Sequence, residues 1–236
     1  MLRDEFLITM QKFVNHIDLT IRQIEGEVRL EIPEVELTDE FSDRIVRRFK
    51  RSEQPDDIKF VEEDEALTNT LESVVYKWEA QISQAIEVQN RRLPKDNGPL
   101  AEIDYWKERN INLSGIFEQT KQEKAKQILE ILSSIESPAS SSFEGQRLDL
   151  SKLYSEAKDN VRFLSTLERH FKNICYGSSF HVVAETLPSM MNALRMIWII
   201  SRHYNKDERM VPLMERIAHE LSERVSKVIN VRKILE

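Results

Sequence analysis

The strongest constraint on this chain is a set of long apolar stripes that repeat at helical spacing. Between residues 65 and 92, apolar side chains recur at steps of four, three, four, four and three: Leu67, Leu71, Val74, Trp78, Ile82 and Ala85. This spacing places them on one face of a helix, close to a heptad seam over almost three repeats. Long helices with a single apolar stripe pack antiparallel in bundles.

Comparable stripes predict an all-α protein, an elongated bundle of about five or six long amphipathic helices. We expect these helices over about residues 2–25, 65–92, 99–132, 147–175, 188–201 and 207–235. Shorter helices are expected around Phe41 to Phe49 and just before Pro188.

The segments between the stripes predict where helices stop. Val28, Leu30 and Ile32 alternate with charged residues and Pro33 follows, so a short extended segment or edge strand is expected near residues 27–37. The stretches expected to be connectors are 51–64, the turn "LPKDNGP" at 93–99 and the Ser-rich "SPASSSFEG" at 137–145. We divide the chain into an N-terminal segment, 1–64, and a helical bundle, 65–236.

Composition limits the class of protein. Charged residues make up 32% of the chain, with 5 Gly and 7 Pro, which suits long helices in water. The net charge of −7 argues against a nucleic-acid binder. A single cysteine, Cys175, excludes an internal disulfide, and the most apolar stretch, 194–200, is too short to cross a membrane. With charged residues near Met1 and no signal peptide, we expect a soluble, intracellular protein or fragment.

Motifs that carry chemistry are missing from the sequence. It contains neither G-x-x-x-x-G-K-[ST] nor G-x-G-x-x-G, and no His-Glu-x-x-His. His170, Cys175 and His181 are neighbours in sequence but straddle an expected helix end, where the helix dipole also disfavours a thiolate. We expect no catalytic, cofactor-binding or metal-binding residues, and we expect His203 to be solvated like the other histidines on helices.

Some features allow two interpretations. The basic run Arg47–Arg51 could bind phosphates or an acidic partner, but acidic residues on both sides favour a solvated helix end. The methionines Met190, Met191 and Met196 could form an adaptable contact surface, but ordinary core is favoured.

Large apolar side chains on the stripes are the candidate packing or interface residues, and ligand stacking is the disfavoured alternative. Trp106 follows the break at Gly98 and Pro99, and we expect it to pack, with its neighbours, against the helix that holds Trp78. The full set is Trp78, Ile103, Trp106, Leu113, Phe117, Leu164, Phe171 and Trp198. From the residues alone the function is a helical module that packs or assembles. An unrelated coiled-coil scaffold or adaptor and an all-helical enzyme are the alternatives.

Five stretches together resemble the N-terminal tail region of axonemal dynein heavy chains, heavy-chain N-terminal region 1. They are "WEAQI" (78–82), "GPLAEIDYWKERNINLSGIFEQ" (98–119), "YSEAKDNVRFLSTLERHFKNI" (154–174), "LRMIWIISRHYNKDERM" (194–210) and "LMERIAHELSERV" (213–225). The resemblance covers about residues 66–230, and "IEGEVRLEIP" (24–33) is similar to the preceding tail segment. The stretch from 200 to 221 is more similar to the two-headed inner-arm type.

The resemblance implies a structural role in the ciliary or flagellar axoneme. Such a tail dimerises or bundles heavy chains, seats intermediate and light chains, and anchors the motor through docking proteins on doublet microtubules. In this family the ATP-hydrolysing ring and the microtubule-binding stalk lie far C-terminal, so no cofactor is expected in this segment. The resemblance implies neither nucleic-acid nor membrane partners, and no binding residue is carried over.

Overall fold

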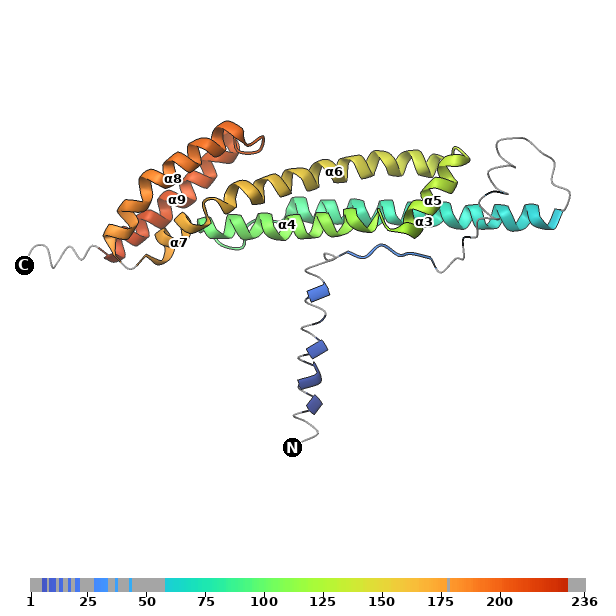
Figure 1. Ribbon diagram of the computed structural model, residues 1–236, viewed down its shortest axis with the longest axis horizontal. Coiled ribbons are helices and arrows are strands. Elements are labelled where there is room, and N and C mark those ends of the chain that lie inside the picture. The colour runs from blue at the N-terminus through green and yellow to red at the C-terminus, as the bar shows by residue number, and fades with distance from the viewer. Residues whose placement is uncertain are drawn as a thin grey trace, which may run out of the picture. The chain divides into compact units, whose positions relative to one another are not determined.

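The computed structural model describes residues 58–177 and 179–228, the extended residues 28–33, and positions 6, 7, 9–11, 13, 14, 17, 20, 21, 37 and 43, without the side chains of 58–63 and 228. Helices α3 to α9 lie within 58–228 (Figure 1). They are α3 (Ile58–Arg91), α4 (Pro99–Gln119), α5 (Glu123–Ser134), α6 (Pro138–Ser165), α7 (Glu168–Tyr176), α8 (Phe180–Ile200) and α9 (Asp207–Val228). None of the described residues belongs to a strand, so the all-α prediction is confirmed.

Two compact units share these helices. Unit 1 comprises Met1–Arg91 and Ile111–Leu153, and unit 2 comprises Arg92–Asn110 and Tyr154–Glu236. The division falls inside α4 and inside α6, so each of these helices contributes one part to each unit. The domain boundary predicted at residue 64 stays a prediction.

The core of unit 1 is organised around α3. Its buried residues follow an unbroken alternation of four- and three-residue steps: Asp64, Thr68, Leu71, Val75, Trp78, Ile82, Ala85 and Gln89. This is a strict heptad seam, apolar in the middle and polar at both ends. The sequence prediction placed Leu67 and Val74 on the seam, and each was wrong by one residue, because the seam keeps its regular step at Thr68 and Val75. The α5 helix packs beside α3, and Phe143 of α6 meets Trp78 with ring centroids 5.9 Å apart.

The core of unit 2 includes α7, α8 and α9, which lie side by side (Figure 1). Phe171 and Ile174 of α7 are fully buried. The buried apolar residues of α8 are Val183, Met190, Leu194 and Ile197, and those of α9 are Met210, Leu213 and Ile217. Trp198, a predicted packing residue, is exposed, and its neighbour Ile197 is buried instead.

Two predicted helices are each divided in the structure. The helix expected over 99–132 ends at Gln119, where the hydroxyl of Thr120 donates to the carbonyl of Phe117 and the amide of Gln122 bonds Gln119 O. The helix expected over 147–175 ends at Ser165, and the hydroxyl of Thr166 donates to the carbonyl of Phe163. Threonine hydroxyls compete for main-chain carbonyls and so favour helix ends.

Three predicted boundaries were wrong in the opposite direction, because helix continues where loop was expected. The α3 helix begins at Ile58, inside the predicted connector. The Ser-rich stretch is the start of α6, with Pro138 as its first residue, a position that proline suits because its missing N–H has no partner there. Pro188 lies inside α8, on its exposed side, where water can reach the carbonyl that proline leaves without a donor.

The N-terminal region is described only in part. Residues 6, 7, 9–11, 13, 14, 17, 20 and 21 are helical, within the expected 2–25. Residues 28–33, named the strap, are non-helical, as the alternating pattern predicted, and none of them pairs as a strand. The basic run Arg47–Arg51 lies outside the described residues, and so does the helix expected around it apart from Asp43.

Candidate functional site

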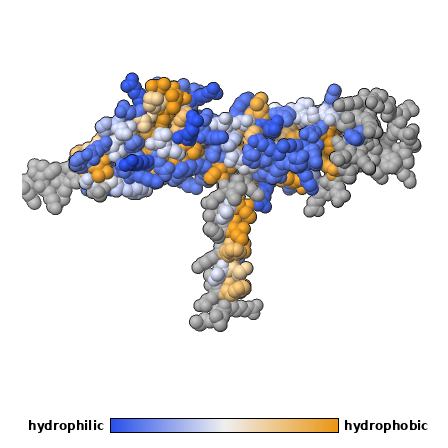
Figure 2. All heavy atoms as spheres, in the orientation of Figure 1, coloured by the Kyte–Doolittle hydropathy of each residue, from blue (hydrophilic) through white to orange (hydrophobic). Residues whose placement is uncertain are grey.

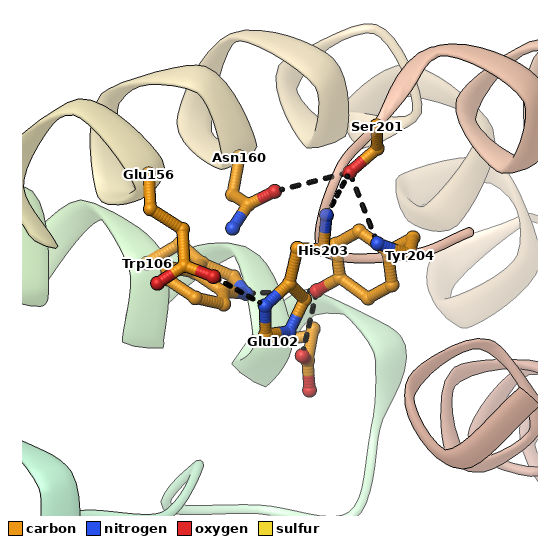
Figure 3. Close-up of polar contacts among 7 residues, drawn as sticks. All are labelled: Glu102, Trp106, Glu156, Asn160, Ser201, His203 and Tyr204. Carbon is orange, nitrogen blue, oxygen red and sulfur yellow. Dashed lines mark hydrogen bonds and ion pairs between the residues drawn. The ribbon is translucent and has the colours of Figure 1, made fainter. Parts of the chain in front are cut away.

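A buried polar junction in unit 2 joins α4, α6 and the turn between α8 and α9 (Figure 3). Its seven members come from these three places, and each one contacts at least one other. We call this group the junction. Its members are Glu102, Trp106, Glu156, Asn160, Ser201, His203 and Tyr204.

The phenol of Tyr204 forms the middle of the junction. It accepts a hydrogen bond from Nε1 of Trp106 at 2.8 Å and donates to Oε1 of Glu102 at 2.8 Å. Both partners lie in the first turns of α4, one turn apart, so they point to the same side. A buried indole N–H and a buried phenol both need partners, and here each satisfies the other.

The turn after α8 is built around the side chain of Ser201, the residue that ends the helix. Its Oγ accepts the main-chain amides of His203 at 3.2 Å and Tyr204 at 3.1 Å, and it donates to Oδ1 of Asn160 at 3.4 Å. One buried hydroxyl thereby orients the two rings that follow it and ties them to α6. Figure 3 shows these contacts converging on one oxygen.

His203 links α6 to α4. Its Nδ1 lies 2.9 Å from Oε1 of Glu156, and because a carboxylate only accepts, the nitrogen donates. Its ring stands edge-on to Trp106, with centroids 4.7 Å apart and an interplanar angle of 81°. Only 12% of its side chain is exposed, so the prediction that His203 is solvated was wrong. The physical reason is the turn at Ser201, which the sequence pattern did not indicate.

The electrostatics of the junction favour a fixed charge pattern. The hydrogen bond from His203 holds the pKa of Glu156 below its usual value, with help from the guanidinium groups of Arg109 and Arg209 and against partial burial. Burial raises the pKa of Tyr204, and the neighbouring carboxylate of Glu102 raises it further, so the phenol stays protonated. The phenol of Tyr204 thus stays a donor to Glu102, and the lowered pKa of Glu156 keeps that carboxylate an acceptor for His203.

We expect the link through Glu156 to weaken in acid. Its pKa is lowered from 4.5 in the folded chain, so its contribution to stability is present above pH 4.5 and is lost as the pH falls through the folded value. The urea unfolding midpoints of the wild type and of Glu156→Gln should differ near neutral pH. The difference should shrink continuously as the pH is lowered below 4.5. A gap that stays constant over that range would contradict this assignment.

A second arrangement, in unit 1, holds the strap. The side-chain amide of Gln119 contacts the main chain twice: Oε1 accepts the amide of Leu30 at 2.8 Å, and Nε2 donates to the carbonyl of Val28 at 2.8 Å. This pair of contacts imitates the bonding of a neighbouring strand. Leu30 itself is 7% exposed, so its side chain is buried in the same place.

The α3 helix supplies the other contacts of the strap. Nε1 of Trp78 donates to the carbonyl of Glu31 at 2.5 Å, and Nε2 of Gln81 reaches the carbonyl of Arg29 at 3.4 Å. We call Trp78, Gln81 and Gln119 the strap seat. All three bind main-chain atoms of the strap.

The predicted packing or interface residues occupy different surroundings. Six are buried: Trp78, Ile103, Trp106, Leu113, Leu164 and Phe171. Phe117 is half-buried beneath Nζ of Lys121, and Trp198 is exposed. Trp106 contacts the ring of Tyr105 beside it in α4 and that of His203 after α8, and the contact with His203 was not predicted. The role of the set in an interface stays a prediction.

Sequence reasoning missed Tyr204, Ser201 and Gln119. A buried Trp106 requires a hydrogen-bond acceptor, but the sequence does not identify it, because Tyr204 lies 98 residues away. Gln119 carried no such signal, because a glutamine near a helix end is ordinary on a solvated surface.

The thiol of Cys175 is half-buried. Burial raises the pKa of the Cys175 thiol to about 11, and the carboxylate of Glu220 adds to the effect, so the thiol stays protonated. Among the described residues, no group of three His, Cys, Asp or Glu side chains could hold a metal ion. Over the same residues, no helix combines the length and the apolar character needed to cross a membrane.

Comparison with known proteins gives a consistent set of relatives. A family model described as "Dynein heavy chain, N-terminal region 1" matches residues 68–236. Dynein axonemal heavy chain 10 of Homo sapiens is 46% identical over 236 residues, 100% of this chain and 5% of that protein. The dynein-1-alpha heavy chain of the flagellar inner arm I1 complex of Chlamydomonas reinhardtii is 38% identical over 232 residues, 98% of this chain and 5% of that protein.

A more distant relative belongs to another part of the same motor system. The dynein beta chain of the flagellar outer arm of Chlamydomonas reinhardtii is 26% identical over 224 residues, 93% of this chain and 5% of that protein. The chain thus spans about 5% of the length of these relatives.

Proposed function

Because the chain belongs to the dynein heavy chain family and matches its N-terminal region 1, we propose that it is a non-catalytic tail segment of an axonemal dynein. In this role it pairs with a second heavy chain and contributes to the platform that carries intermediate and light chains. Through those chains and docking proteins it anchors the motor on doublet microtubules of a cilium or flagellum. The inner-arm name of one relative favours an inner-arm assembly.

The observation that supports assembly most directly is the apolar stripe of the N-terminal helix. Its residues recur at steps of four, three and four, and all are exposed: Phe6, Met10, Phe13 and Ile17. Figure 2 shows this stripe along the helix. An apolar face of this kind on an amphipathic helix marks a protein–protein contact, since leaving it in water costs free energy.

A second apolar surface lies over the C-terminal end of α8 (Figure 2). It consists of exposed residues from one short stretch: Met196, Trp198, Ile199 and Ile200. The α8 helix is therefore apolar on more than its core-facing side, which is the composition expected of a helix with a further contact.

The test is co-expression of this chain with the N-terminal region of a second axonemal heavy chain. We expect the two to co-purify and to sediment as a pair in analytical ultracentrifugation. Met10→Lys with Phe13→Lys places two charges on the stripe and should abolish the pair. Gln11→Lys adds a charge on the same helix between the two stripe positions and off the stripe, and it should leave the pair intact.

Two results would overturn the proposal. One is a wild-type chain that stays alone at micromolar concentration with every heavy-chain tail offered. The other is ATP turnover by the purified chain itself, since the proposal assigns hydrolysis to the part of the relatives that lies outside this segment.

A further inference from the structure

A groove in unit 1 begins at the N-terminal end of the strap and runs on between α3 and α4. Its volume is about 420 Å³. Val28 and Arg29 form one end, α3 provides Ala85 and Val88, and α4 provides Ile116. Side-chain amides of Gln81, Gln84, Gln89 and Asn112 line the rest. The groove is thus an apolar floor bordered by amides.

The strap shows what this kind of surface binds. Its main chain is held by amide and indole groups of the strap seat, and one apolar side chain, Leu30, is buried beside them. Gln81 belongs both to the strap seat and to the groove, so the two are continuous. The direction also agrees: Glu31 lies against Trp78 and Arg29 against Gln81, so the strap runs opposite to α3 and the groove continues its line.

One polar atom in this region has unused capacity. Oε1 of Gln81 is buried, and among the described residues no donor lies within hydrogen-bonding distance of it. A buried acceptor without a donor costs free energy, and a main-chain N–H is a group that would satisfy it. Nε2 of the same side chain already bonds a main-chain carbonyl, so one amide would contact two peptide groups, as Gln119 does.

We propose that this groove binds an extended peptide segment of a partner protein, laid end to end with the strap. The partner chemistry is a main chain without helix, with apolar side chains at alternate positions that reach Ala85, Val88 and Ile116. Amides give the main-chain bonds and the apolar floor selects the side chains, which is the division of roles in strand-addition sites. This site is separate from the heavy-chain pairing described above and goes beyond it.

The test uses the full chain with a photo-crosslinking p-benzoylphenylalanine in place of Val88. The probe is a fluorescent peptide with the strap sequence of residues 27–37, which has the required alternation. We expect crosslinking at Val88 and none from the same group at Tyr76, which lines a different groove on α3. Gln81→Ala should lower peptide affinity about fivefold, the value of one lost hydrogen bond. Gln127→Ala on α5, outside the groove, should leave it unchanged.

Hydrogen exchange at the amide of Leu30 distinguishes a peptide that binds beside the strap from a peptide that displaces the strap. In the proposed mode the amide of Leu30 stays protected while the peptide binds. Faster exchange at Leu30 would show that the peptide displaces the strap, and equal crosslinking at Val88 and Tyr76 would show non-specific adhesion. Either result overturns this inference and leaves the heavy-chain pairing unaffected, because that pairing is measured with variants of the N-terminal helix.

Discussion

Trp106→Ala is expected to lower the free energy of unfolding of unit 2 by about 3–5 kcal/mol, the cost of removing a buried indole. The ring is 3% exposed and stands edge-on to His203. Its loss opens a cavity and also leaves the phenol of Tyr204 without its donor. Urea unfolding followed by far-UV circular dichroism measures the change.

A conservative variant separates the ring from its N–H. Trp106→Phe keeps most of the packing and removes the hydrogen bond to Tyr204, so it should cost about 1–3 kcal/mol. The expected order of stability is wild type, then Trp106→Phe, then Trp106→Ala. An unchanged midpoint for the alanine variant would show that the junction does not hold unit 2 together.

Trp78→Ala is expected to have an effect of similar size in unit 1, about 3–5 kcal/mol. Trp78 is 1% exposed, lies in the middle of the heptad seam and contacts Phe143. It differs from Trp106 in a second consequence, because its Nε1 binds the carbonyl of Glu31. Hydrogen exchange should therefore accelerate at the amide of Leu30 as well as across α3.

Gln119→Ala serves as the matched control for that second consequence. It removes two main-chain contacts of the strap and leaves the ring contacts of Trp78 intact. We expect a cost of about 1–3 kcal/mol, from two hydrogen bonds, together with fast exchange at Leu30. Slow exchange at Leu30 in this variant would show that the buried leucine side chain, not the strap seat, retains the strap.

The all-α class followed from the sequence because apolar periodicity is a local property. The stripe around Trp78 predicted α3, although it placed two residues wrongly, at Leu67 and Val74. Prediction was poorer at helix ends. The helix breaks at Thr120 and Thr166 carry threonine hydroxyl contacts to main-chain carbonyls. No glycine or proline marks these breaks in the sequence. At Pro138 and Pro188 the error was the opposite, because a loop or a helix start was expected where helix is present. The effect of proline depends on its position within a helix.

The junction could be predicted only in part. Burial of Trp106 followed from its place on a stripe, but its partner Tyr204 lies 98 residues further along the chain. An apolar pattern within one helix cannot identify a partner that lies so far away in the sequence. The same holds for Gln119 and Leu30, which are 89 residues apart. The sequence predicted the extended strap from its alternating pattern, but it did not predict that Gln119 binds the strap.

The way the strap is gripped has an evolutionary consequence. Three side chains hold it by peptide groups that every residue except proline possesses in full. A substitution at the exposed Glu31 keeps the carbonyl that Trp78 binds, while Leu30 is constrained by its burial. The charge at position 31 can therefore change while the backbone path of the strap stays the same.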